Sequence, residues 1–283
     1  MKLDLHVHST YSDGAYTPQM LLDTAAGLGL NVMSITDHDN ILSYGIAQEY
    51  IKEKGYDIEI IPGVEINTLY NNEEIHILGY FMDFENSDFK QMLKDQQNAR
   101  ITQTHQIVEL LNKKANIPVT FEQINNYVAP GGSIGRPHIA KAIVVAGGAQ
   151  NVMQAYAKYI NDDSEVYIQR ETVSPHDAVE IIYEAGGIPV VAHPCDVANP
   201  EKLVTELMNY GLRGVEAYHR KHSPAMVEYY FSMAEKYNLI VTGGSDFHSP
   251  NNNNIIYLGK IFIPEWVYTN LKKEKEHIEI AGI

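Results

Sequence analysis

The sequence predicts an α/β protein: a distorted seven-stranded βα barrel with an inserted helical subdomain. Two features predict the barrel. Short apolar segments typical of strands recur along the chain, and amphipathic segments typical of helices separate most of them. A third feature predicts the insertion, because about a hundred residues separate the fourth and fifth apolar segments, where a βα unit needs only a few dozen.

Seven apolar segments have the length and composition of strands. They cover residues 3–7, 32–36, 58–65, 75–81, 188–193, 213–218 and 239–243. Apolar residues at three- and four-residue spacing predict helices at residues 18–28, 174–185, 200–209 and 224–237. This alternation favours a parallel sheet, in which functional side chains gather at the carboxyl ends of the strands. Seven units instead of eight imply a distorted or incompletely closed barrel.

The insertion divides the chain into two expected parts. We expect the barrel to comprise residues 1–82 and 173–283, and the helical subdomain to comprise residues 83–172. Its helices are expected at residues 88–116, 120–127, 137–145 and 151–160. Because the insertion follows the carboxyl end of a strand, we expect it to emerge at the rim of the active site and to cover the pocket as a lid.

Composition excludes several classes of protein. An apolar content of 45% without a long apolar run argues against a membrane protein. The net charge of -15 argues against binding to long nucleic acid, although a small anionic substrate remains compatible with it. The first expected strand leaves no room for a signal peptide and the chain has a single cysteine, so we expect a cytoplasmic protein.

That cysteine, Cys195, follows His193-Pro194 and allows two interpretations. It could be a metal ligand or a nucleophile. A free cysteine beside a strand end is more often a small buried apolar residue, and no His/Cys triad pattern surrounds it.

Nine side chains of metal-ligand type lie at or just beyond the ends of the expected strands. They are His6, His8, Asp13, His38, Glu65, His76, His193, Asp246 and His248. Nitrogen and carboxylate ligands without thiolates suit Mn, Fe or Zn. Nine ligands exceed the needs of one ion, so we expect two or three divalent ions with a carboxylate such as Glu65 as a bridge. Clustered ions favour hydrolysis, of phosphate esters above all.

The insertion contains Gly135-Arg136-Pro137-His138, which offers two candidate substrate-binding residues. A guanidinium such as that of Arg136 binds phosphate through two parallel hydrogen bonds, and His138 would assist it. The alternative is that Arg136 and His138 only cap a helix at the surface.

Six motifs resemble those of the PHP (polymerase and histidinol phosphatase) family, and in particular its branch of small phosphoesterases acting on nucleotides. They occur in the same order as in the family, at residues 6–14, 35–39, 62–65, 76–80, 192–194 and 244–248. Asp13 stands where some branches of the family have histidine, which points to the nucleotide branch.

The resemblance implies the PHP fold and a trinuclear site. One ion would be held by His6, His8, Glu65 and Asp246, a second by Asp13, His38 and His248, and a third by Glu65, His76 and His193. A metal-bridging hydroxide would attack phosphorus, while Arg136 and His138 would hold a substrate phosphate.

Two further residues, Asp37 and His222, are expected to have catalytic roles. Asp37 is expected to orient a ligand or a water molecule. In the segment Tyr218-His219 to His222, either histidine could donate a proton to the leaving oxygen, and family practice favours His222. A solvated loop histidine is the alternative for His222.

The expected activity is hydrolysis of the 3'-phosphate of nucleoside 3',5'-bisphosphates, which gives the 5'-monophosphate and phosphate. Manganese is the expected metal, with iron or zinc as alternatives. A 5'-to-3' exonuclease acting on short oligoribonucleotides, an amide-hydrolysing metalloenzyme and a non-catalytic scaffold are the alternative functions.

Overall fold

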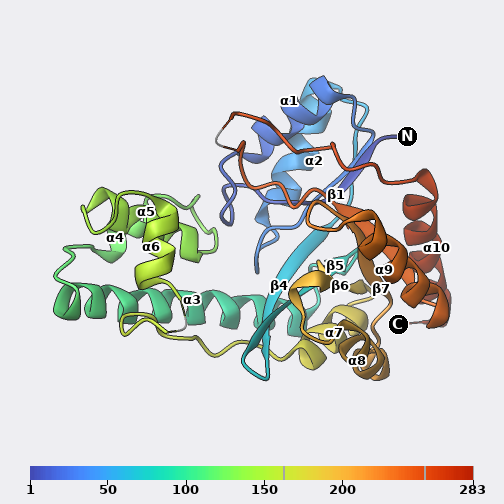
Figure 1. The fold of residues 1–283 in the computed structure, drawn as a ribbon. Helices are drawn as coiled ribbons and strands as arrows, with labels where there is room; N and C mark the ends of the chain where they lie inside the picture. Colours follow the sequence, from blue (N-terminus) through green and yellow to red (C-terminus); the bar gives the residue numbers. More distant parts are fainter. Residues whose placement is uncertain (162, 252, 283) are drawn as a thin grey trace.

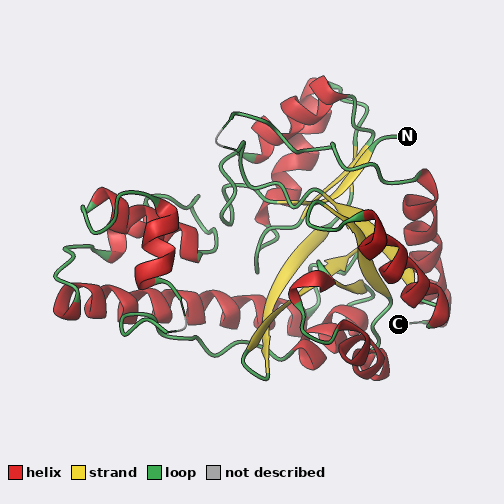
Figure 2. Ribbon diagram, in the orientation of Figure 1, coloured by secondary structure: helices red, strands yellow, loops and turns green. Residues whose placement is uncertain are grey.

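The computed structural model describes residues 1–161, 163–251 and 253–282. These residues form eight strands in two sheets, of three and five strands, with helices around them (Figure 2). The strands are β1 (Leu3–Val7), β2 (Val32–Ile35), β3 (Glu59–Ile60), β4 (Gly63–Tyr70), β5 (Glu73–Tyr80), β6 (Ile188–Val191), β7 (Gly214–His219) and β8 (Ile240–Gly244).

Most of the helices connect consecutive strands (Figure 1). The described α-helices are α1 (Pro18–Leu28), α2 (Leu42–Lys54), α3 (Ser87–Lys114), α4 (Phe121–Asn125), α5 (Arg136–Val145), α6 (Val152–Tyr159), α7 (Pro175–Glu184), α8 (Pro200–Leu207), α9 (Pro224–Lys236) and α10 (Glu265–Ala281). Several begin with a side-chain cap followed by proline, as Thr17 and Pro18 do in α1, because proline lacks the N–H that the first helical turn cannot use.

The prediction of an α/β fold is confirmed, whereas the seven-stranded barrel is not confirmed, because the described strands form one sheet of three and one of five. The expected strand at residues 58–65 is divided into β3 and β4, which belong to different sheets. Pro62 lies at the break and has no N–H to donate to a neighbouring strand. Isolated parallel bridges connect the two sheets, from Val7 to Phe247 and from His38 to Glu65.

The expectation of an all-parallel sheet is wrong for β5, which runs antiparallel to both of its neighbours. Asn71 and Asn72 form the two-residue connection between β4 and β5, with φ angles of 52° and 65°. Asparagine tolerates this left-handed backbone, and a connection of two residues can join only antiparallel strands. The Asn-Asn pair between two strand-like segments was the available signal for this hairpin.

The reversal of β5 changes how the insertion reaches the site. Tyr80, at the carboxyl end of β5, pairs with Ile188 at the start of β6, so the insertion leaves the sheet at the end opposite the ligand-bearing ends. We expected a lid at the rim because the insertion follows the carboxyl end of a strand. That argument is wrong, because the carboxyl end of β5 lies away from the ligands. Helix α3 has 28 residues, about 42 Å in length, and carries the chain back past the site.

Contacts along α3 show this path (Figure 1). Phe89, near its start, belongs to the hydrophobic core around the five-stranded sheet. Arg100, near its middle, donates from Nε to Asp39 Oδ2 at 2.8 Å, one residue from the predicted ligand His38. Ile107 and Leu111 belong to a second hydrophobic cluster formed with α4, α5 and α6. The four helices expected in the insertion are present, whereas the subdomain limits at residues 83 and 172 stay a prediction.

Within the described residues, no helix combines the length and the apolar composition that a bilayer-spanning segment requires.

A pair of glycine substitutions tests the close packing of β1 against β8. A Cβ atom at Gly244 would lie 2.3 Å from His6 Cβ and 2.4 Å from His6 N, so Gly244→Ala should lower the free energy of unfolding by about 1–3 kcal/mol or more. A Cβ atom at Gly45, within α2, would meet none of the described neighbouring atoms within 4 Å, so Gly45→Ala should raise it by about 0.5–1 kcal/mol. Urea denaturation measures both, and equal effects of the two substitutions would contradict this packing.

Candidate metal centre

His6 and His8 begin the centre at the carboxyl end of β1. Alternation along the strand places both side chains on the same side, and their Nε2 atoms lie 3.1 Å apart. Both residues are completely buried. If each neutral ring carries its proton on Nδ1, the two facing Nε2 atoms both present lone pairs. A shared cation is a natural partner for such a pair.

The Glu65 carboxylate lies at the middle of the centre, with its two oxygens facing different groups of histidines. Oε2 is 3.3 Å from His6 Nε2, 3.2 Å from His8 Nε2 and 3.0 Å from His38 Nδ1. Oε1 is 2.8 Å from His76 Nδ1 and 3.1 Å from His193 Nε2. This arrangement gives Glu65 the geometry of a bridging ligand.

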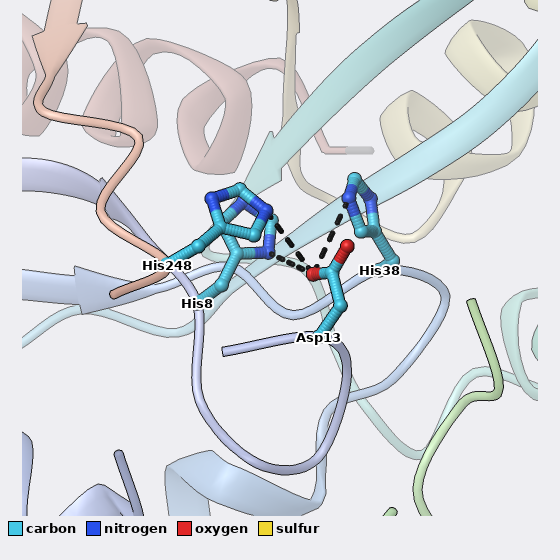
Figure 3. A group of neighbouring side chains, drawn as sticks. All are labelled: His8, Asp13, His38 and His248. Carbon is cyan, nitrogen blue, oxygen red and sulfur yellow. Dashed lines mark ion pairs between the residues drawn. The ribbon is translucent and has the colours of Figure 1, made fainter. Parts of the chain in front are cut away.

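Asp13 forms a second focus with three histidines, as Figure 3 shows. Its Oδ1 is 3.1 Å from His248 Nε2, 3.8 Å from His38 Nε2 and 3.9 Å from His8 Nδ1. Asp13 lies in the loop after β1, whereas His38 follows β2 and His248 follows β8. Three strand ends therefore contribute to one group of ligand atoms.

Asp246 connects this group to the first one. Its Oδ1 is 3.7 Å from His6 Nε2, 3.4 Å from His8 Nε2 and 3.3 Å from His248 Nδ1. Asp246 has a φ angle of 50° and His193 one of 23°, both in the left-handed region that such residues seldom adopt. Backbone strain of this kind is concentrated at functional sites, and here it occurs at two predicted ligands.

The nine predicted ligands fit a divalent metal. Buried Asp13 Oδ1, Glu65 Oε2 and His38 Nδ1 have no hydrogen-bond partner among the described residues, although each has a ligand-type atom within about 3 Å of it. Ligands of one tetrahedral ion at 2.0–2.1 Å lie about 3.3 Å from each other. The contacts among His6, His8 and Glu65, at 3.1–3.3 Å, match this separation. Buried ligand-type atoms at such separations, several of them without a hydrogen-bond partner among the described residues, fit a common ion.

The carboxylates of the centre are held in the ionised form. Burial raises the pKa of Glu65, but the surrounding imidazoles, above all those of His38, His6 and His76, outweigh burial and hold the pKa well below the ordinary value. The pKa of Asp13 is lowered in the same way, since His248 and His38 outweigh the effect of burial. Ionised carboxylates are the form that binds metal.

The histidines respond to burial and to these carboxylates in different ways. Burial lowers the pKa of His38 to about 3, so this imidazole is neutral and one of its two ring nitrogens carries a free lone pair. Burial opposes the charged form of His76, yet Glu65 raises its pKa to about 10. Likewise Asp13 and Asp246 raise the pKa of His248 to about 9 against the effect of burial. A bound cation takes the place of the protons on such residues.

Glu216 supports two of the ligands and was not predicted. His6 Nδ1 donates to Glu216 Oε1 at 3.0 Å, and the His193 backbone N–H donates to Glu216 Oε2 at 2.7 Å. A carboxylate that accepts from the far nitrogen of a ligating histidine fixes its tautomer and orientation. An acid within the apolar strand β7 was the available signal, because glutamate is seldom fully buried without partners.

Asp37 lies beneath the loop that carries Asp13. It accepts hydrogen bonds from Ser9 N–H at 2.7 Å, Ser9 Oγ at 2.6 Å and Ser12 Oγ at 2.6 Å. Asp37 therefore fixes the loop from residue 9 to residue 12. Its expected catalytic role, which is to orient a ligand or a water molecule, stays a prediction.

A cavity of about 600 Å³ opens beside the centre. It is lined by His38, Glu65, Glu73, Glu74, His76, Arg136, His193, Cys195, Asp196, Val197, Ala198, Lys221, Asp246 and His248. Arg136 thus shares a cavity with predicted ligands, where its guanidinium is paired with Glu74.

One ring nitrogen of His138 and one of His222 are each hydrogen-bonded to the backbone. His138 is buried, and its Nδ1 accepts from the Gly135 N–H at 2.9 Å, which caps α5. Burial also lowers the pKa of His138 to about 4. His222 lies outside the set of described residues that line the cavity, and its Nδ1 donates to the Ala217 carbonyl at 2.8 Å. Phosphate binding by His138 and proton donation by His222 stay predictions.

Glu216→Gln tests the support of the ligands. The amide keeps the shape of the side chain but loses the charge that holds His6, so the affinity for divalent metal should fall by roughly 10–100-fold. Calorimetric titration of metal-free protein with Mn²⁺ measures this change. Glu228→Gln, on the exposed surface of α9, is the matched control and should bind as the wild type does. Unchanged affinity in Glu216→Gln would remove Glu216 from the metal centre.

Comparisons with known proteins agree on one family. A model of the PHP domain matches residues 4–171. The chain is 32% identical over 251 residues to the 5'-3' exoribonuclease Rnm of Escherichia coli (strain K12), covering 87% of this chain and 85% of that protein. It is 29% identical over 252 residues to a 3',5'-nucleoside bisphosphate phosphatase of Chromobacterium violaceum, covering 88% and 87%.

A solved structure has the same fold. It is a protein from Bifidobacterium adolescentis classed as a metal-dependent phosphoesterase, with a TM-score of 0.85, 30% identity, and coverage of 95% of this chain and 94% of that one. The buried His, Asp and Glu groups of this chain are in keeping with such an enzyme. The chain belongs to the PHP domain family and is a metal-dependent phosphoric ester hydrolase.

Proposed function

We propose that this enzyme is a phosphomonoesterase that removes the 3'-phosphate of nucleoside 3',5'-bisphosphates and leaves the 5'-monophosphate. One observation carries the proposal. The cavity beside the predicted ligands is lined by Glu65 and His76 and also by Arg136, whose guanidinium is paired with Glu74. A phosphate placed between them would contact the metal centre on one side and a fixed positive charge on the other. The printed name of the Chromobacterium violaceum relative supports the choice of a bisphosphate.

The nine ligands are assigned to three ions in this proposal. The first ion takes His6, His8, Glu65 and Asp246, the second Asp13, His38 and His248, and the third Glu65, His76 and His193. The opposite orientation of the two Glu65 oxygens supports a shared carboxylate between the first and third ions. Manganese is the proposed metal, because oxygen and nitrogen ligands accept it, with iron or zinc as alternatives. When bound, such ions activate water and neutralise charge on the phosphoryl oxygens.

The residues of the chain bind and orient the substrate. Arg136 is paired with Glu74, whose other oxygen accepts from Asn67 Nδ2 at 3.0 Å. An incoming phosphate would replace the Glu74 carboxylate as the partner of Arg136, since a phosphate offers a fork of acceptor oxygens. His138 is the second phosphate-binding residue in this proposal, and its cap on α5 holds the start of the helix that carries Arg136. Asp37 acts in the same indirect way on Asp13.

A second candidate activity is 5'-to-3' exonuclease action on short RNA. The printed name of the Escherichia coli relative favours it. The net charge of -15 favours the smaller substrate, because a longer RNA brings more phosphates toward an acidic surface. Since the family identifies a phosphoric ester hydrolase, amide hydrolysis and a non-catalytic scaffold are no longer proposed.

A direct comparison of substrates separates these activities. With Mn²⁺ added, kcat/KM for a nucleoside 3',5'-bisphosphate should exceed kcat/KM for a short 5'-phosphorylated RNA. Released phosphate and released mononucleotide are measured in parallel. A preference of about tenfold or more for RNA, equal to about 1.4 kcal/mol in transition-state binding, would reverse the ranking.

Arg136→Ala tests the phosphate contact. Loss of a charge-assisted hydrogen bond costs about 1.5–3 kcal/mol, so kcat/KM for the bisphosphate should fall by about 10–150-fold. Arg213→Ala is the control, because Arg213 is paired with Glu274 outside the residues that line this cavity. Steady-state kinetics on both variants provide the measurement. An Arg136→Ala enzyme with wild-type kcat/KM would exclude the contact.

A further inference from the structure

A third group of ligand-type side chains lies outside the nine predicted ligands. Cys195 follows β6, His219 ends β7 and His222 lies in the loop after it. One potential ligand atom from each of these residues lies within 4.8 Å of the other two. The group therefore brings a sulfur and two imidazoles to the end of two neighbouring strands.

His222 has the tautomer and the free atom that metal-binding histidines show. Its Nδ1 donates to the Ala217 carbonyl at 2.8 Å, which leaves the lone pair of a neutral ring on Nε2. That Nε2 atom is buried, and within the described part of the chain it has no hydrogen-bond partner. A histidine held by a backbone carbonyl through one nitrogen, with the other nitrogen unsatisfied, matches the arrangement of a metal ligand with its supporting contact.

His219 and Cys195 complete the group. His219 is 2% exposed, and its ring centroid lies 5.2 Å from that of His222. Cys195 is half-buried and belongs to the wall of the cavity beside the main centre. Its sulfur has a weak contact with Asp196 Oδ1 at 3.6 Å, so no strong hydrogen bond has to be broken before it binds an ion.

We propose that Cys195, His219 and His222 form a separate site for zinc or another borderline-soft divalent cation. Thiolate and imidazole are both ligand types that zinc accepts, and three protein ligands leave a fourth position open. The nine ligands of the main centre include no sulfur, so the two sites differ in the metals that they prefer. On binding, the Cys195 S–H bond breaks, a sulfur–metal bond forms and the proton passes to solvent.

The position of this site connects it to the main centre. His219 Nε2 lies 3.4 Å from Asp246 Oδ2, and Asp246 Oδ1 faces His6 and His8. An ion that takes His219 as a ligand changes the hydrogen bonding of Asp246. Occupancy of the sulfur site and occupancy of the main centre should therefore influence each other, equally in both directions. This inference does not depend on the identity of the organic substrate.

Cobalt provides a probe that reports the sulfur ligand alone. Co²⁺ bonded to a thiolate has a ligand-to-metal charge-transfer absorption in the near ultraviolet, which nitrogen and oxygen ligands do not give. The chain contains one cysteine, so such a band can arise only from Cys195. Titration of the metal-free full-length protein with Co²⁺ should produce the band with a stoichiometry of one, and added Zn²⁺ should remove it.

Two variants distinguish the proposed site from a sulfur that merely reaches the main centre. His222→Gln should weaken the Co²⁺ affinity read from the band by at least about tenfold, since one of three ligands is lost. His277→Gln, at an exposed histidine of α10, should leave the band unchanged. Thermal unfolding followed by circular dichroism checks that both variants are folded.

The result of this test does not depend on the proposed activity, because the experiment measures an absorption band and not catalysis. Absence of the band at saturating Co²⁺, or a band of unchanged affinity in His222→Gln, would overturn the proposal. X-ray absorption of zinc-loaded wild-type protein gives an independent measurement. It should show a sulfur neighbour at about 2.3 Å, and a zinc ion bound only by nitrogen and oxygen would contradict the site.

Discussion

The buried negative charge of Glu65 is the constraint on which the centre depends. Its side chain is 1% exposed, and an isolated carboxylate in such a place would cost several kcal/mol. Imidazoles from β1, from β5 and from the loops after β2 and β6 surround it, so compensation requires these segments to meet. Glu65 also forms the bridge to His38 that connects the two sheets. The same residue thus joins the sheets and organises the ligands.

Histidine side chains alone do not neutralise the negative charge of the buried carboxylates, and this explains the affinity of the centre for metal. Protons on His76 and His248 offset part of the negative charge, while His38 stays neutral. Oxygens of Asp13 and Glu65 remain buried without hydrogen bonds from the described residues. Divalent ions satisfy these oxygens and the neutral imidazoles together, which no set of protons can do. Binding and folding of the loops around the centre are therefore coupled.

Local patterns predicted which side chains gather at the centre, because each of the nine predicted ligands depends on its own strand. His6 and His8 face the same side through the alternation of β1, and the others follow short apolar segments whose ends are visible in the sequence. The direction of each strand could not be predicted from these local patterns. The reversal of β5 depends on the backbone of Asn71 and Asn72, and the division into β3 and β4 occurs at Pro62. Neither feature changes the hydrophobic pattern that predicted the strands.

Long-range contacts were the least predictable part of the site. Glu216 supports His6 from 210 positions away, and Glu74 pairs with Arg136 across 62 positions, so no local spacing relates them. His138 was recognised as a member of a motif, but its cap on Gly135 depends on how α5 begins. A sequence motif indicates which residues gather, whereas packing decides what each one contacts.

The pairing of Tyr80 with Ile188 has an architectural consequence. The long segment between these residues leaves and rejoins the sheet at adjacent points, on the side away from every ligand-bearing strand end. Its length can therefore change near these two points without displacing a strand, whereas loss of Arg100 in α3 would free Asp39 beside the predicted ligand His38. Substrate preference can diverge through the helices of this segment while the catalytic centre keeps its geometry.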